Sequence, residues 1–313
     1  MLDKIESIKD VVYYLKPDLL IQKNYVRPLY LNKMGGDKQM SETLKDFSSP
    51  ALIMAIEANQ FELWRILAQM LKTELHHDSD MIWLSTDIPF YLCNLVGRVQ
   101  FDPNDIDARI DVTLARFKSR GMPMSWWTGP ATRPTDLGKY LEAHALTHIE
   151  DYPGMAVDLL KLNVDLSVPP SLTIERVGDV EGLKKWIHPF TVGIGYPDYF
   201  AKIIFDSTVA LGFGLHLPTC DYVGLLKGEP VACSTLMLGS GVAGIYNVAT
   251  VPEARWQGIG TAMTLAPLRE ARTLGYRVAI LQSSQIGLRV YRRLGFKEYC
   301  KIGMYMWTGE ING

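Results

Sequence analysis

One segment near the C-terminus limits the possible folds more than any other part of the chain. Residues 246–262 are YNVATVPEARWQGIGTA: an apolar strand pattern, a proline, a short polar turn, and two glycines that open a helical pattern. This order places unpaired backbone N–H groups at a helix N-terminus, where they can bind an anion beyond the strand end. Gly258 and Gly260 carry no side chain that would keep an anion from the backbone. The segment predicts a strand–turn–helix unit with an anion site.

Two better-known phosphate loops fit this segment less well. A P-loop ends in Gly-Lys-Ser/Thr, whereas Gly260 is followed by Thr261 and Ala262. The dinucleotide-binding fingerprint requires a third glycine and an acidic residue about 20 positions later, where this chain has Ile280 in an expected strand. A strand–turn–helix whose glycines serve packing alone remains an alternative at this point.

A second segment lies further along the chain. Residues 283–296 are SSQIGLRVYRRLGF; they follow the apolar strand pattern Val278–Leu281 and predict a helix that ends at Gly295. The chain thus contains Arg-x-x-Gly-x-Gly at 255–260 and Tyr-x-x-x-Gly-Phe at 291–296. This pair resembles the GNAT superfamily of acetyl-CoA-dependent N-acetyltransferases. The resemblance covers roughly residues 171–313.

The resemblance implies a cofactor site and a catalytic residue. Backbone amides from Gln257 to Ala262 would hold the CoA pyrophosphate, the strand end would pair with the pantetheine arm, and Tyr291 would lie near the thioester sulfur. The implied acetyl-CoA-binding residues are Ala249, Thr250, Val251, Arg255, Gln257, Gly258, Ile259, Gly260, Thr261, Ala262 and Ser284. No metal is expected. Ser284 and Gly287 stand where many members have Asn and Ala, which weakens one expected CoA contact.

The chemistry of acetyl transfer agrees with this assignment. The reaction needs a neutral amine, stabilisation of an oxyanion, and a proton for the departing thiolate. A free strand-end N–H can stabilise the oxyanion, and the Tyr291 phenol can supply the proton as a general acid. The alternative for Tyr291 is a ring that packs on the sheet with its hydroxyl in water.

The general base is less clear from the sequence. The strand before the glycine loop, Ile245–Val248, contains no Asp or Glu. Asn247 can position a water but cannot take a proton at neutral pH. Glu253 has the position of a capping residue, and His216 lies in an expected loop. We therefore expect a water-relayed base, with the acceptor near Tyr246 and Asn247 and at the junction with the N-terminal half.

Composition excludes several classes of function. The 313 residues suffice for two domains, and a net charge of −2 with 21% charged residues gives no field that attracts nucleic acid or anionic lipid. The four cysteines lack metal-type spacing, the first six residues are too charged for a signal peptide, and no apolar run of about 18 residues occurs. We expect a cytoplasmic protein that binds neither nucleic acid nor membrane.

The adjacent prolines Pro169 and Pro170 give the best domain boundary. We expect an appended helical or irregular segment at 1–50, a degenerate GNAT-like domain at 51–167, and the acetyl-CoA-binding GNAT domain at 168–313. The fold class is α+β, with each domain a mixed, mostly antiparallel sheet flanked by helices. In the C-terminal domain, helices are expected near 179–190 and 197–211 and strands at 221–227, 230–238 and 243–251. Pro267 should kink the helix that follows the loop, and a closing pair of strands should end at Trp307.

The N-terminal half repeats part of this plan. A helix at 110–121, a strand at 123–128 and a helix at 136–146 follow one another, so that Gly121 matches Gly275 and Leu141 falls where Tyr291 stands. Two carboxylates, at positions 102 and 105, replace the glycine loop and would repel a pyrophosphate. This half is similar to the degenerate half of tandem-GNAT proteins, although helix–strand–helix is also a common unit. Within the strand, Trp126 and Trp127 should point to opposite faces, one into the core.

Three functions fit these observations. The leading one is an N-acetyltransferase that acts on a primary amine of a small molecule or peptide. The others are a non-catalytic acetyl-CoA-binding module or sensor, and an acyl or aminoacyl transferase with a different donor. The intact glycine loop and the near-neutral charge favour CoA over a tRNA-borne donor.

Overall fold

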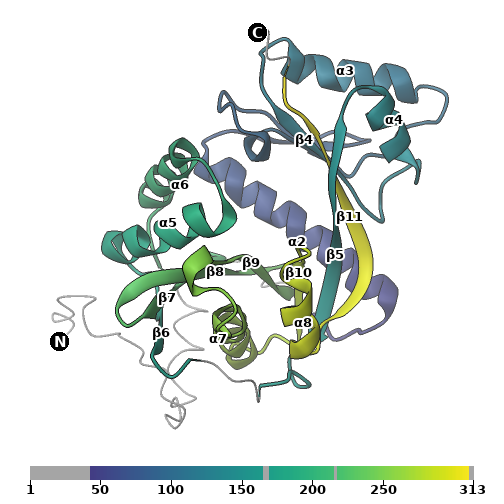
Figure 1. Ribbon diagram of the computed structural model, residues 1–313. Coiled ribbons are helices and arrows are strands. Elements are labelled where there is room, and N and C mark those ends of the chain that lie inside the picture. The colour runs from purple at the N-terminus through teal and green to yellow at the C-terminus, as the bar shows by residue number, and fades with distance from the viewer. Residues whose placement is uncertain (1–42, 165–168, 215–216, 310–313) are drawn as a thin grey trace, which may run out of the picture. The chain divides into compact units, whose positions relative to one another are not determined.

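The computed structural model describes residues 43–164, 169–214 and 217–309 (Figure 1). Most of the segment expected at 1–50, and His216, therefore lie outside the described residues. The helices are α2 (Ser49–Met70), α3 (Ile106–Lys118), α4 (Leu137–Ala143), α5 (Val180–Ile194), α6 (Asp198–Leu211), α7 (Ile259–Thr273) and α8 (Leu288–Leu294), with short 3-10 turns η2 (Tyr91–Cys93) and η3 (Pro252–Ala254). The strands are β1 (Leu75–His77), β2 (Ile82–Leu84), β3 (Leu95–Gly97), β4 (Met124–Thr128), β5 (Thr147–Asp158), β6 (Leu172–Arg176), β7 (Thr219–Leu226), β8 (Glu229–Gly239), β9 (Val242–Thr250), β10 (Val278–Gln282) and β11 (Lys297–Trp307).

The strands form a mixed sheet, and the fold is α+β as expected. Their hydrogen-bonded order is β1-β2-β3-β4-β11-β5-β10-β9-β8-β7-β6. The expectation of two domains with a sheet each is therefore corrected to a single series of 11 strands. The chain nevertheless divides into two compact units. Unit 1 contains Asn163–Leu238 and Ile245–Gly275, and unit 2 contains Ser41–Leu162, Gly239–Gly244 and Tyr276–Gly313.

Unit 2 combines strands from both halves of the sequence. β10 and β11 both pair antiparallel with β5, and β11 also pairs antiparallel with β4. The six strands in the order β3-β4-β11-β5-β10-β9 are arranged symmetrically. If β3, β4 and β5 of the first half are exchanged with β9, β10 and β11 of the second, the same order is obtained, read backwards. The pairs β3–β4 and β9–β10 are both parallel. The expected closing pair of strands was wrong: β11 is one strand with register shifts, and its partners come from the first half. The sequence pattern marks a strand but not which strand it pairs with.

Unit 1 is built in three layers. β6, β7 and β8 are antiparallel neighbours, and β9 follows in the sheet order. Helices α5 and α6 lie on one side of these strands and α7 on the other (Figure 1). The Tyr222 hydroxyl donates to Glu270 of α7 at 2.5 Å, so the next side chain along β7, that of Asp221, points to the α5 side. The helices and strands expected between 179 and 251 are confirmed to within a few residues.

Helix α7 runs through Pro267 as one element from Ile259 to Thr273. A proline lacks the N–H that would bond to the carbonyl four residues earlier. That carbonyl belongs to Met263, and it accepts instead from the Ser234 hydroxyl of β8 at 2.8 Å. A side chain of the sheet thus satisfies the group that the proline leaves unpaired, which the sequence alone does not show.

The two tryptophans of β4 point to opposite faces, as expected. Trp126 is fully buried in the core of the first half, against Phe101 and the helices α3 and α4. Trp127 is half-buried and stacks on Tyr152 of β5, with 5.7 Å between ring centroids. Leu141, which the sequence places at the tyrosine position of the repeat, is fully buried in the same core as Trp126.

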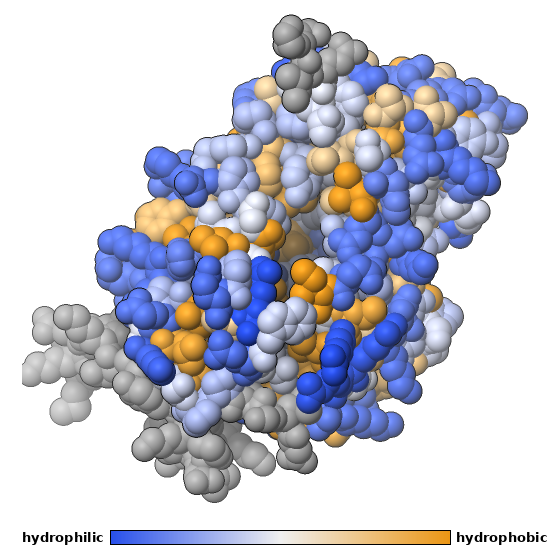
Figure 2. All heavy atoms as spheres, in the orientation of Figure 1, coloured by the Kyte–Doolittle hydropathy of each residue, from blue (hydrophilic) through white to orange (hydrophobic). Residues whose placement is uncertain are grey.

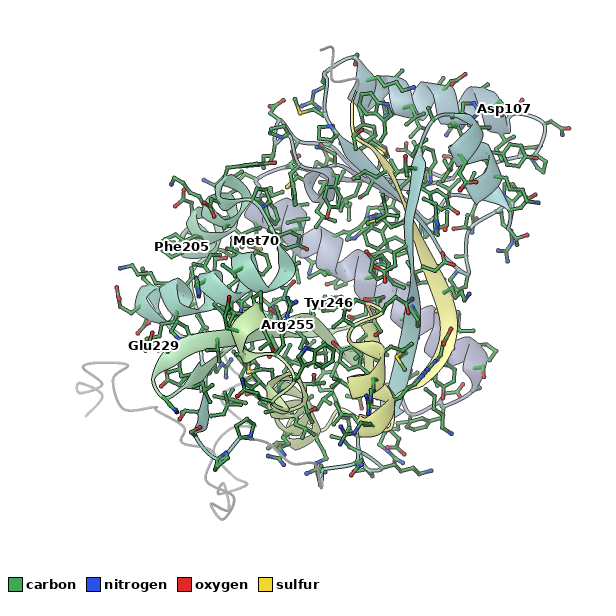
Figure 3. The ribbon with its side chains drawn as sticks, in the orientation of Figure 1. Met70, Asp107, Phe205, Glu229, Tyr246 and Arg255 are labelled. Atoms are coloured by element: carbon green, nitrogen blue, oxygen red, sulfur yellow. The ribbon has the colours of Figure 1, made fainter. Side chains whose placement is uncertain are left out.

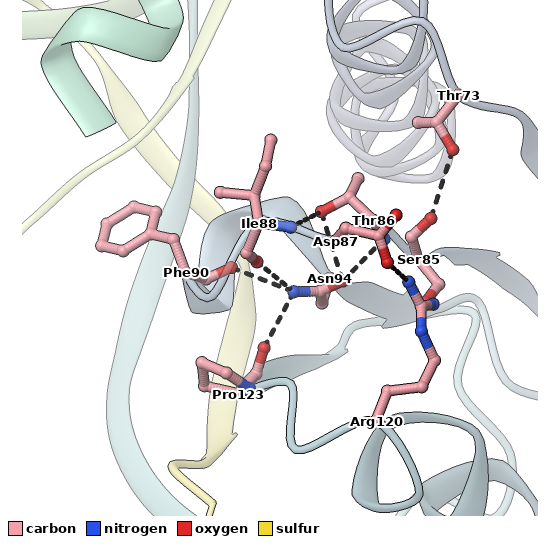
Figure 4. A network of polar contacts seen from close by, with 9 residues as sticks. All are labelled: Thr73, Ser85, Thr86, Asp87, Ile88, Phe90, Asn94, Arg120 and Pro123. Carbon is pink, nitrogen blue, oxygen red and sulfur yellow. Dashed lines mark hydrogen bonds and ion pairs between the residues drawn. The ribbon is translucent and has the colours of Figure 1, made fainter. Parts of the chain in front are cut away.

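A polar network fixes the loop between β2 and β3 (Figure 4). The buried Asn94 side chain accepts from the Thr86 N–H at 2.8 Å and donates to the carbonyls of Ile88, Phe90 and Pro123 at 2.9, 3.3 and 3.1 Å. One amide therefore binds four backbone groups; the carbonyls of Ile88 and Phe90 also accept from the backbone N–H groups of Phe90 and Cys93, whereas no other bond is found among the described residues for the Thr86 N–H and the Pro123 carbonyl.

We expect Asn94→Ala to lower the free energy of unfolding by about 2 kcal/mol or more, because it leaves buried backbone groups unpaired. Denaturant unfolding measures the change. Arg120→Ala is the control, since Arg120 also binds this loop, through Ser85 and Asp87, but as an exposed pair worth at most about 1 kcal/mol. Equal effects of the two substitutions would contradict a structural role for the amide.

On the face shown in Figure 2, hydrophobic residues form separate patches between hydrophilic ones. Within the described residues, no helix is both long and apolar enough to cross a membrane.

Candidate functional site

The predicted glycine loop follows β9 in unit 1. The Val251 N–H donates to the Val231 carbonyl at 2.9 Å, which holds the end of the strand. Because successive N–H groups of a strand point to opposite edges, that of Thr250 points away from β8. On the α5 side, a Cβ at Gly193 would come within 2.9 Å of Ala249 and 3.2 Å of the Thr250 backbone. Helix α5 therefore packs directly on the strand end.

The two glycines occupy positions that suit an anion. Gly258 is the N-cap of α7 and has φ +80, a backbone conformation that strains other residues. A Cβ at Gly260 would meet no atom within 4 Å, so the space above it is open. The first N–H of α7 with a helical partner is that of Ala262, which bonds to Gly258 at 3.2 Å. The amides before it face outward at the positive end of the helix dipole, and this arrangement fits a pyrophosphate.

Arg255, which is labelled in Figure 3, fixes the loop. Its side chain donates hydrogen bonds to two carbonyls. Its Nε donates to Thr250 at 3.1 Å and its Nη2 to Gly193 at 2.9 Å. The guanidinium thus ties the loop both to the end of β9 and to the end of α5. Trp256, which the sequence reasoning did not single out, has φ +65 and is 90% exposed beside this loop.

We expect Arg255→Lys to weaken acetyl-CoA binding roughly 10-fold, although the positive charge stays. A lysine has no planar fork and cannot reach both carbonyls in the same geometry. Calorimetry measures the affinity, and Arg269→Lys in the exposed part of α7 is the control. Unchanged affinity would show that the two hydrogen bonds do not contribute to binding.

Tyr291 lies on α8 in unit 2 and is buried. Its ring packs against the backbone of Gly287, where an added Cβ would come within 2.7 Å of the ring. The absence of a side chain at Gly287 therefore accommodates this ring. Burial raises the pKa of the phenol well above its usual range, so Tyr291 keeps its proton at neutral pH.

The structure brings some predicted site residues together and keeps others in separate units. Ala249–Val251, Arg255 and Gln257–Ala262 form one continuous strand end and loop in unit 1. Ser284 and Tyr291 belong to unit 2, where the Ser284 hydroxyl accepts from the Gly287 N–H at 3.3 Å at the start of α8.

The region expected to hold the general base contains a carboxylate that the sequence reasoning missed. Asn247 of β9 donates to the Thr235 hydroxyl of β8 at 3.1 Å, and that hydroxyl donates to Asp221 of β7 at 2.5 Å. Burial raises the pKa of Asp221 to about 6. A charged residue inside the otherwise apolar pattern TCDYVGLL was the available signal. Glu253 is exposed on η3.

The matching position in the first half is acidic. Helix α3 has Asp105 as its N-cap and Asp107 in its first turn. The Asp102 carboxylate accepts from the Asn104 N–H and side chain, both at 2.9 Å. Carboxylates therefore occupy the helix N-terminus where an anion would bind, as the sequence predicts. Within the described ranges, no group of three or more His, Cys, Asp and Glu could hold a metal.

Comparison with known proteins finds a family match for the segment that contains the site. Residues 183–296 match the sequence profile of the acetyltransferase (GNAT) family, whose members carry out acyl-CoA-dependent acetyl transfer. This segment includes both the glycine loop and Tyr291. No curated protein matches the sequence.

Solved structures share the fold at low sequence identity. A GCN5-related N-acetyltransferase from Kribbella flavida superposes with a TM-score of 0.61 at 19% identity, covering 82% of this chain and 96% of that chain. A functionally unknown conserved protein from Staphylococcus epidermidis gives 0.58 at 14% identity, covering 76% and 94%. A GCN5-related N-acetyltransferase from Sphaerobacter thermophilus gives 0.55 at 15% identity, covering 85% and 94%. The fold is thus a GNAT-like α+β fold over most of the chain.

Proposed function

We propose that this chain is an N-acetyltransferase that transfers acetyl from acetyl-CoA to a primary amine of a small molecule or peptide. The observation that carries the proposal is the start of α7 at Gly258–Thr261, whose outward amides and open space at Gly260 fit a pyrophosphate, inside a segment that matches the family profile. The profile match also spans Tyr291, which supports a catalytic role for this residue.

Each site residue has a distinct role in this proposal. Within Gln257–Ala262, the amides that precede Ala262 bind the pyrophosphate, since the Ala262 N–H bonds to the Gly258 carbonyl. Arg255 holds the loop, and the strand end Ala249–Val251 pairs with the pantetheine arm. Ser284 contributes a further contact. Acetyl-CoA supplies the activated acyl group as a thioester. Tyr291 gives its proton to the departing sulfur as the amine nitrogen bonds to the acetyl carbon and the C–S bond breaks. Tyr246 and Asn247 contact the acceptor, and a water takes the amine proton.

The test is turnover of acetyl-CoA by the full chain with a panel of primary amines: amino acids, polyamines, amino sugars and a peptide N-terminus. Release of free CoA thiol is measured together with the mass of the acetylated amine. We expect thiol release that depends on one class of amine. Binding of acetyl-CoA without turnover on any amine would identify a non-catalytic module, and turnover with another acyl donor alone would identify a different transferase.

A further inference from the structure

Three polar side chains form a continuous line across three strands of unit 1. Asp221 on β7 and Thr235 on β8 stand opposite each other in the sheet register. The Thr235 hydroxyl donates to Asp221 Oδ1 at 2.5 Å, and Asn247 Nδ2 on β9 donates to the Thr235 oxygen at 3.1 Å. The line begins at a carboxylate and ends at an amide on the strand that leads into the glycine loop.

The chemistry of the three groups fixes the orientation of the amide. An ionised carboxylate only accepts, so the single proton of the Thr235 hydroxyl goes to Asp221. The hydroxyl oxygen then accepts from the NH₂ group of Asn247, and the carbonyl branch of the same amide must point away. Oδ1 of Asn247 has no hydrogen-bond partner among the described residues.

The backbone of Asn247 is held as well. It has φ +52, a left-handed conformation that asparagine adopts more readily than most residues. Its carbonyl accepts from the buried Cys233 thiol at 3.2 Å. Main chain and side chain are therefore both fixed, and Oδ1 is the one acceptor of this residue left for a ligand.

We propose that Asp221 and Thr235 position Asn247 so that its Oδ1 accepts a hydrogen bond from the acceptor amine. The inference rests on the function proposed above and deepens it. A neutral primary amine has two N–H groups and one lone pair. It can donate one N–H to Oδ1 while the lone pair is directed at the acetyl carbon, whereas a tertiary amine offers no N–H. Asn247 contacts the substrate, and Asp221 and Thr235 are positioning residues.

The charge of Asp221 makes this arrangement dependent on pH. The titratable group that faces it from β8 is the buried thiol of Cys233, whose pKa burial raises, so it stays neutral. Its neighbours on β7, Cys220 and Tyr222, point to the α7 side. On the α5 side, Lys185 forms an ion pair with Glu175 of β6 at 3.7 Å. The buried side chains of α5 carry no charge; they are Leu183, Trp186, Pro189, Phe190 and Thr191.

Asp221 is thus the group of this cluster that changes charge near neutral pH. Burial raises its pKa from the usual 3.8 to about 6, so it is ionised above that pH and protonated below. Once protonated, it can donate to Thr235, whose own proton is then free to turn toward Asn247 Oδ1. The amide orientation is therefore fixed while Asp221 is ionised and lost as Asp221 takes up its proton.

The test compares the full-length wild type with Thr235→Val, Thr235→Ser and Asp221→Asn. Thr235→Val keeps the shape but can neither donate nor accept, and we expect kcat/KM for the amine to fall about 10-fold with acetyl-CoA affinity unchanged. Thr235→Ser keeps the hydroxyl and should retain activity. Asp206→Asn, on the exposed face of α6, controls for the loss of one carboxylate.

A pH profile separates positioning from a structural role. Because the neutral amine reacts, log(kcat/KM) of the wild type should rise with a slope of about one, steepening to about two below pH 6 as Asp221 protonates. Asp221→Asn should keep a slope of about one throughout. If the slope of Asp221→Asn still changed near pH 6, or if kcat/KM of Thr235→Val were unchanged, this inference would be overturned and the proposed function would stand. A wild type that transfers acetyl to no amine would overturn the proposed function as well.

Discussion

Tyr291→Phe should lower kcat by about 10²-fold, within the range for loss of a general acid, and leave acetyl-CoA affinity nearly unchanged. The substitution removes one hydroxyl and keeps the ring that packs against Gly287. Because burial holds the phenol pKa well above neutral pH, the wild-type residue carries its proton throughout the working range. Steady-state thiol release gives kcat, and calorimetry gives the affinity.

The matched control for this variant is Tyr299→Phe. Tyr299 lies on β11 in unit 2, is half-buried, and packs on the core that includes residues of α2, away from α8. Removal of the Tyr299 hydroxyl should leave kcat within about twofold of the wild type. Normal turnover of Tyr291→Phe would mean that the Tyr291 ring only packs.

Gly258→Asp should weaken acetyl-CoA binding on the order of 10-fold or more, since one unfavourable charge contact costs above ~1.4 kcal/mol. The new carboxylate would stand at the N-terminus of α7, where the outward amides otherwise face the pyrophosphate. Calorimetry on the full chain measures the effect.

Gly258→Asn separates charge from backbone strain in this experiment. Asparagine has the shape of aspartate without the charge and tolerates the left-handed conformation at φ +80 better than most residues. We expect Asn to retain most of the affinity that Asp loses. Equal losses would assign the effect to the backbone, and unchanged affinity in both variants would refute the loop assignment.

Local patterns in the sequence predicted most of the elements that build the site. The strand, proline and two glycines before α7 specified the turn and the helix start, because the backbone conformation at Gly258 and the helix N-terminus depend on neighbours in the chain. In the same way, the strand–helix–glycine pattern predicted α8 and its end at Gly295. The assignment of acetyl-CoA to this loop and of acid catalysis to Tyr291 remain predictions.

Local patterns could not predict the Asp221–Thr235–Asn247 line of hydrogen bonds. Its three members are far apart in the sequence and meet only because β7, β8 and β9 are neighbours in the sheet. No spacing rule connects them. The same holds for the hydrogen bond from Arg255 to the Gly193 carbonyl at the end of α5, whereas its other partner, Thr250, is only five residues away.

The sequence by itself determined the identity of the local units: which segments are helices or strands, where the glycine loop lies, and that the first half carries carboxylates at positions 102 and 105 in its place. Those properties follow from short-range backbone preferences and periodicity. Only the tertiary structure decided the strand partners. β5 of the first half lies between β10 and β11 of the second, and Ser234 satisfies the carbonyl that Pro267 leaves unpaired. The pairing of strands and the hydrogen bonding of buried polar groups depend on contacts between residues that are distant in the sequence, and local patterns do not encode these contacts.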